Sequence, residues 1–127
     1  MQKTTPMIAM AIALSTPLTS KAQASFSTEF PAGAVALEPQ ALKTLLLGKV
    51  ATTQVATGPV LKVTYKDTYA FLNAGNFADS GKWRVEGSSV CIDWQKITPS
   101  CTEVRAVDDA IYIKRSSNGE VVRQTMH

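Results

Sequence analysis

The segment from Gly81 to Arg105 constrains the fold of this chain more than any other part, because it contains both tryptophans and both cysteines of the 127 residues. Trp83 belongs to one run in which apolar and polar side chains alternate, and Trp94 belongs to a second run after Gly87-Ser88. Alternation with a period of two is typical of β-strands with one buried face. The segment therefore predicts an antiparallel β-hairpin.

The two cysteines, Cys91 and Cys101, are predicted to form a disulfide, since an even pair in a small exported domain is usually oxidised. Both are in phase with polar residues, so we expect the bond on the outer face of the hairpin, where it sets Ser89 opposite Glu103. A loop of this length gives roughly 2–3 kcal/mol of stabilisation. A metal site is disfavoured, because His127 is the only histidine and the ligand set is too small.

Residues 1–24 predict a signal peptide that directs the protein to the periplasm or out of the cell. Lys3 precedes an apolar run over 7–14, and Ala22-Gln23-Ala24 matches a cleavage site. The run is far shorter than the roughly 20 residues that span a bilayer, so we expect no membrane-spanning segment after cleavage. The alternative, an amphipathic first helix, is disfavoured by the prolines on both sides of the run.

The charge of the chain gives little reason to expect a nucleic-acid partner. There are 13 Lys and Arg residues and 10 Asp and Glu residues, for a net charge of +3. Two of the cations, Lys3 and Lys21, belong to the predicted signal peptide, so the charge of the remaining chain falls to +1. A nearly neutral domain without a basic run does not match the electrostatic pattern of nucleic-acid binding.

After an extended lead-in over 25–37, the pattern predicts one disulfide-clipped domain over 38–127. It begins with a helix over 38–47, which has a proline in its first turn and stops before a glycine. Further segments have strand-like patterns, and the Asn- and Gly-rich stretch 73–81 predicts a loop. The strand-like segments are 50–57, 60–66, 69–72, 82–86, 89–94, 102–107, 110–115 and 121–125.

The predicted fold is mainly β. One N-terminal helix precedes an antiparallel meander of six to eight short strands, curled into a half-barrel or a small barrel. The alternative is an α+β arrangement in which the helix covers one face of the sheet. Parallel α/β folds are disfavoured, because no crossover helices separate the strands. Asn118-Gly119 predicts the last hairpin turn.

The sequence offers little catalytic chemistry, and we do not expect an enzyme. The one histidine is the last residue, where chain ends fray, and no nucleophile elbow, phosphate loop or cofactor-binding motif occurs. Asp93 and Glu103 could share one face of neighbouring strands as a general acid and base. We favour the interpretation that they are two solvated surface residues.

Four aromatic residues are candidates for an apolar pocket: Tyr65, Phe71, Trp83 and Trp94. They either fill the core of a small β domain or line the mouth of a barrel that takes an apolar ligand. Gly81-Lys82-Trp83 is similar to the G-x-W motif of lipocalin-like barrels. The chain is too short, however, for an eight-stranded lipocalin.

A longer stretch combines GKWRVEGSSVCIDW, Cys101 followed by Thr-Glu-Val-Arg, and Ile-Tyr-Ile-Lys over 111–114. Before it, the predicted helix ends in Leu-Leu-Gly-Lys over 46–49. Over roughly 42–114 the chain thereby resembles an uncharacterised family of small exported proteobacterial proteins with a signal peptide, a G-x-W-x-V segment and a cysteine pair. The resemblance implies export and a disulfide, and it implies neither an activity nor catalytic residues.

These patterns predict a non-catalytic binding module for a protein or a cell-envelope component, of which an inhibitor of lysozyme-type hydrolases is one version. The alternative is a carrier of small apolar ligands, and the second alternative is a carboxylate-dependent hydrolase. The candidate binding face is the polar side of the hairpin, with Lys82, Arg84, Glu86, Asp93, Glu103 and Arg105.

Overall fold

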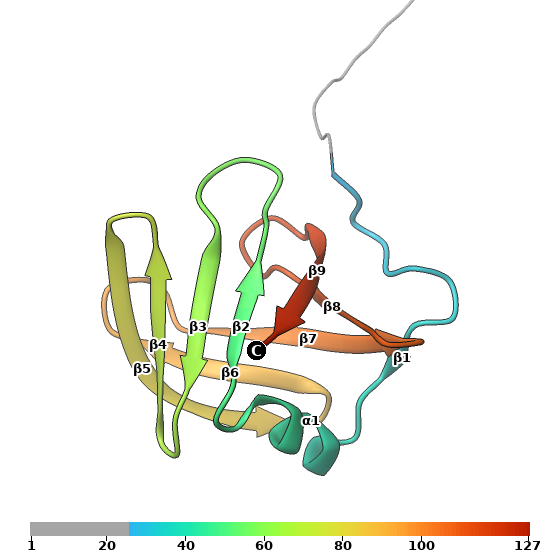
Figure 1. The fold of residues 1–127 in the computed structure, drawn as a ribbon, viewed down its shortest axis with the longest axis horizontal. Helices are drawn as coiled ribbons and strands as arrows, with labels where there is room; N and C mark the ends of the chain where they lie inside the picture. Colours follow the sequence, from blue (N-terminus) through green and yellow to red (C-terminus); the bar gives the residue numbers. More distant parts are fainter. Residues whose placement is uncertain (1–25) are drawn as a thin grey trace, which may run out of the picture.

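The computed structural model describes residues 26–127, which form a β-barrel with one short helix (Figure 1). The predicted signal peptide, residues 1–24, lies outside the described residues. Within the described range, no helix is long and apolar enough to cross a membrane.

Nine strands and one helix make up the described chain. They are β1 (Val35–Ala36), α1 (Pro39–Leu46), β2 (Val50–Thr53), β3 (Leu61–Tyr65), β4 (Tyr69–Ala74), β5 (Phe77–Glu86), β6 (Ser89–Trp94), β7 (Ser100–Val107), β8 (Ala110–Lys114) and β9 (Val121–Met126). Strands β2 to β9 pair in chain order, each antiparallel to the next, and β9 pairs with β2. This closes an eight-stranded barrel, to which β1 adds a short extra strand beside β7. The mainly β prediction is confirmed, and closure makes the fold a barrel and not a half-barrel.

Helix α1 covers one end of the barrel (Figure 1). Pro39 lies in its first turn, where the missing N–H leaves no intrahelical hydrogen bond unmade. Leu42 and Leu46 lie one turn apart on one face and are fully buried in a cluster that includes Trp83. Gly48 follows the helix with a φ of +79°, a left-handed conformation that favours glycine. Burial of the leucine face thus holds a short helix that would be marginal alone.

Strand β5 begins inside the stretch 73–81, so the prediction of a loop there was wrong. Only two residues separate β4 from β5. The composition misled because two residues typical of loops have structural roles in β5. Asp79 is buried and accepts backbone hydrogen bonds. Gly81 lets β6 approach closely, since a Cβ on Gly81 would lie 2.2 Å from the carbonyl oxygen of Asp93.

The disulfide joins β6 to β7 as predicted. Cys91 and Cys101 are direct partners in the antiparallel register, and Ser89 lies opposite Glu103. Cys91 shares the outward face with Arg84, its partner on β5, and is nevertheless only 1% exposed. The bond therefore clips two strands on the outside and leaves the interior of the barrel free.

Candidate functional site

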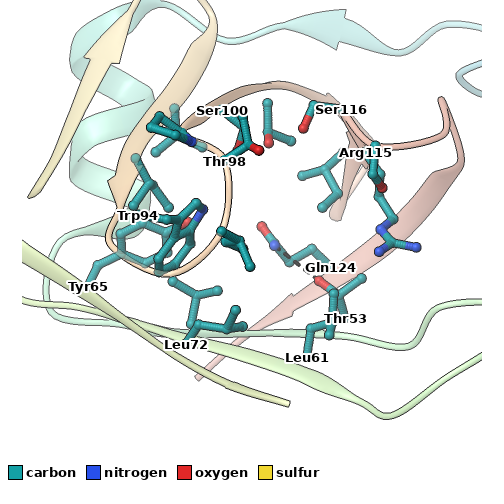
Figure 2. Close-up of a pocket in the computed structure, with 18 residues that line it drawn as sticks. Thr53, Leu61, Tyr65, Leu72, Trp94, Thr98, Ser100, Arg115, Ser116 and Gln124 are labelled. Atoms are coloured by element: carbon teal, nitrogen blue, oxygen red, sulfur yellow. Dashed lines mark hydrogen bonds between the residues drawn. The ribbon is translucent and has the colours of Figure 1, made fainter. Parts of the chain in front are cut away.

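A cavity of about 680 Å³ lies inside the barrel, toward the end opposite α1 (Figure 2). Four connections surround this end: β2–β3, β4–β5, β6–β7 and β8–β9. The apolar or aromatic lining residues are Leu61, Val63, Tyr65, Leu72, Val90, Ile92, Trp94, Ile97, Pro99 and Ile113. The polar lining residues are Thr53, Thr98, Ser100, Thr102, Arg115, Ser116, Ser117 and Gln124.

Polar and apolar side chains are interspersed around the cavity: Thr53 lies opposite Leu61 in the register, and Ser100 lies opposite Ile92. Strands β3 and β4 present Leu61 and Leu72 on one wall, whereas Ser100 lies across the cavity from them (Figure 2). Strand β7 contributes two hydroxyl groups, because Ser100 and Thr102 occupy successive inward positions. The cavity is therefore amphipathic: most of its wall is apolar, and hydroxyl groups from several elements lie among the apolar side chains.

Gln124 of β9 brings an amide group into the cavity. The residue is 7% exposed, and its Nε2 donates a hydrogen bond to Oγ1 of Thr53 on β2 over 3.1 Å. The amide is directed toward the middle of the cavity (Figure 2). Among residues 26–127, no donor bonds to Gln124 Oε1. This acceptor is consequently available to a molecule inside the barrel.

Arg115 is the only charged residue among the described residues that line the cavity, and it is already paired. Its Nη1 lies 3.0 Å from Oε1 of Glu120, whose side chain is only 3% exposed. The Glu120 carboxylate also accepts the backbone N–H of Ala56 over 2.8 Å. Figure 2 shows the guanidinium turned away from the middle of the cavity. The ion pair thus lies within the β8–β9 connection, and the Glu120–Ala56 hydrogen bond joins that connection to β2–β3. Among the described lining residues, no charge is left without a partner.

Asp79 fixes the β6–β7 connection, which forms another part of the rim. Its carboxylate accepts the backbone N–H groups of Ser80, Gln95, Lys96 and Ile97 over 2.7–3.3 Å. Burial alone would raise the pKa of Asp79, but these four hydrogen bonds hold that pKa below its usual value. The ionised carboxylate thus keeps this connection in place beside the cavity.

The structure separates the four aromatic residues that were predicted for an apolar pocket. Tyr65 and Trp94 line the cavity. Trp83 lies in the core toward α1, where its ring meets Tyr65 edge to face with centroids 5.0 Å apart and its Nε1 donates to the Lys66 carbonyl over 2.7 Å. Phe71 lies on the outer face of β4 and is 41% exposed, because its two neighbours take the inward positions.

The six residues of the predicted binding face share the outer surface of β5, β6 and β7. Their charges largely neutralise one another. Arg84 pairs with both Glu86 and Asp93, and Arg105 pairs with Glu103 over 2.7 Å. The sixth residue, Lys82 of β5, lies opposite Asp93 in the register. The structure thus gathers this face and places most of its charges in ion pairs.

Asp93 and Glu103 are not brought together as a catalytic pair. Glu103 lies opposite Ser89, which is four positions from Asp93 along β6. At about 3.3 Å per residue, the two positions are roughly 13 Å apart along the sheet. Each carboxylate is paired with a different arginine, Asp93 with Arg84 and Glu103 with Arg105. The one cluster of metal-ligand types in the described chain is Glu86 with the two cysteines, whose sulfurs are bound to each other.

Sequence patterns missed Gln124, Asp79 and the inward hydroxyl groups of Ser100 and Thr102 on β7. For Gln124 a signal existed, because it has the same spacing as the apolar Val122 and therefore shares its face of the strand. An amide at an inward-facing position indicates a polar group in the interior. For Asp79 there was none, since residues typical of loops surround it and only the register shows which amides it meets.

Comparisons of this chain with protein-family models, with curated proteins and with solved structures found no match. The resemblance to small exported proteobacterial proteins accordingly stays a prediction.

Proposed function

We propose that this protein is a carrier that binds a small, largely apolar ligand inside the open end of its barrel. The observation that carries the proposal is the cavity of about 680 Å³. Ligand sites of known proteins typically measure about 300–1,000 Å³ and combine apolar walls with a few polar groups. The size and the lining of this cavity match both features.

The two ends of the barrel support a carrier role. Helix α1 closes one end with fully buried leucines, so a ligand enters from the other end. There, Asp79 and the Arg115–Glu120 pair hold the rim connections in position. A preformed site of this kind loses little conformational entropy on binding. If residues 1–24 direct export as predicted, the carrier works in the periplasm or outside the cell.

Titration with Nile red, an uncharged apolar dye, tests the proposal. We expect saturable enhancement of the dye's emission and a change in the emission of Trp94, which lines the cavity. Val63→Phe places a larger side chain inside the cavity and is expected to weaken binding at least tenfold. The matched control Thr64→Phe adds the same ring on the other face of β3 and should bind like the unmodified protein.

Two results would contradict a carrier role. One is the absence of saturable binding by the folded protein to Nile red and to a panel of other uncharged apolar compounds. The other is equal binding by the Val63→Phe and Thr64→Phe variants, since that would place the dye on the outside of the barrel.

A binding module that acts through its outer surface is the second candidate function. The observation that favours it is a pair of exposed rings on β4, Tyr69 and Phe71, with 40% and 41% exposure and centroids 6.4 Å apart. Exposed aromatic residues are common in interfaces. Cross-linking of the folded protein in a periplasmic extract, compared with that of the Tyr69→Ser/Phe71→Ser variant, tests it. If both proteins cross-link to the same partners, the exposed rings no longer support a binding role for the outer surface.

A further inference from the structure

The cavity offers hydrogen-bonding capacity but no free charge. Arg115 is held by Glu120, and no carboxylate or lysine belongs to the described lining. Lys96 on the nearby β6–β7 connection donates to the carbonyl of Ala78 over 2.8 Å and is not among the lining residues. A charged ligand group would lose its hydration inside the barrel without gaining an ionic partner, which is unfavourable.

Two buried polar side chains of the lining have a hydrogen-bonding atom that no described residue pairs. Gln124 Oε1 accepts no hydrogen bond from the described residues, and Gln124 is 93% buried, as its 7% exposure shows. Tyr65 is equally deep at 3% exposure, and no described residue bonds to its hydroxyl. Buried tyrosine hydroxyls and amide oxygens usually have partners, because leaving them unpaired is costly. Both groups therefore favour a ligand with polar atoms.

We infer that the ligand is an uncharged amphiphile with an apolar body and a hydroxyl or amide N–H that donates to Gln124 Oε1. This inference rests on the proposed carrier function and narrows it to one chemical class. The apolar body lies against Leu61, Leu72 and their apolar neighbours, and the hydroxyl groups of β7 accommodate any further polar atom. Gln124 is then the residue that determines specificity for the polar group.

Calorimetric titration with three probes of equal chain length tests the inference: octanol, methyl octyl ether and octanoate. Octanol has a donor, the ether has only an acceptor, and octanoate is charged at neutral pH. We expect octanol to bind about tenfold tighter than the other two, because an unmade hydrogen bond to a buried group costs about that factor. Competition with Nile red shows that a probe occupies the cavity.

Gln124→Met keeps the length of the side chain and removes the acceptor. In this variant we expect octanol and the ether to bind with affinities within about twofold of each other, with the ether's affinity retained. The control Thr125→Met changes the next residue of β9, which is exposed, and should keep the preference for octanol. Thermal unfolding of both variants shows whether they are folded.

The outcomes separate the inference from the function on which it rests. Equal binding of octanol and the ether to the unmodified protein, or tighter binding of octanoate, overturns the inference while leaving a carrier of apolar ligands intact. This comparison needs no variant, so it holds even if Gln124→Met does not fold. Failure of all the probes and of Nile red to bind overturns the carrier function, and the inference with it.

Discussion

The two ends of the barrel are built from the same eight strands, yet one end is filled and the other is hollow. At the α1 end, Leu42 and Leu46 of the helix and Trp83 of β5 form a packed core, and the indole N–H of Trp83 donates to a carbonyl oxygen. At the other end, inward side chains such as Leu61, Leu72 and Thr102 border a cavity and do not fill it.

The difference between the ends lies in what occupies them and in the pairing of polar groups, because α1 places two buried leucines at one end only. Large side chains with satisfied polar atoms make a core, because close packing gains dispersion energy and leaves no group unpaired. At the open end no described helix occupies the space between the strands, and Gln124 adds an amide oxygen that no described residue pairs. A closed sheet with these two kinds of end is suited to holding a ligand at one of them.

The largest expected effect comes from truncating one leucine at each end. Leu46→Ala should lower the free energy of unfolding by about 3 kcal/mol, because it opens a cavity in a packed core. Leu72→Ala should cost about half as much, since that side chain already borders a cavity. Urea unfolding followed by circular dichroism measures both losses. Equal losses would mean that the two ends are packed alike.

Removal of the disulfide is the next largest perturbation. Cys91→Ser with Cys101→Ser should destabilise the protein by roughly 2 kcal/mol and leave a β-rich circular dichroism spectrum, because the clip lies outside the core. Amide exchange should accelerate in the β6–β7 connection and remain slow in α1. Complete loss of the β spectrum would show instead that the barrel cannot close without the bond.

Asp79→Asn tests the open end alone. The variant should be less stable at neutral pH and should exchange the amides of Lys96 and Ile97 faster, because the ionised acceptor is lost. The pKa of Asp79 is lower in the folded protein than in the unfolded chain, so its stabilisation is present above about pH 4 and is lost as the pH falls through the folded value.

Unfolding midpoints of the Asp79→Asn variant and the unmodified protein should therefore differ near pH 7 and converge in acid. The control Asp67→Asn changes an exposed carboxylate of the β3–β4 connection and should show no such convergence. If the unfolding midpoints of the Asp79→Asn variant and the unmodified protein move further apart in acid, the proposed role of the ionised carboxylate is contradicted.

The smallest effect is expected on the outer surface. Arg84→Ala breaks two exposed ion pairs, with Glu86 and with Asp93, and exposed pairs contribute little because water and salt screen them. Neither the unfolding midpoint nor the Nile red affinity should change measurably. A marked loss of affinity would link the outer face to the cavity and remove the distinction between the surface and the open end.

Much of the fold follows from local patterns in the sequence. A period of two predicted the strands around Trp83 and Trp94, and proline and glycine predicted the limits of α1. The same alternation predicted the outward disulfide and the register of Ser89 with Glu103, because neighbouring strands pair residue by residue. These features depend on contacts between residues close in the chain, so the sequence by itself determined them.

Tertiary structure alone decided the closure of the barrel and the position of the cavity. Closure depends on β9 reaching β2 across the whole domain, and strands as short as four residues let eight of them fit a chain that seemed too short by comparison with lipocalins. Trp83 and Trp94 have the same alternation, yet one lies beneath α1 and the other lines the cavity. Whether an inward side chain fills space or borders it depends on the volumes of all the strands around it, which no local pattern records.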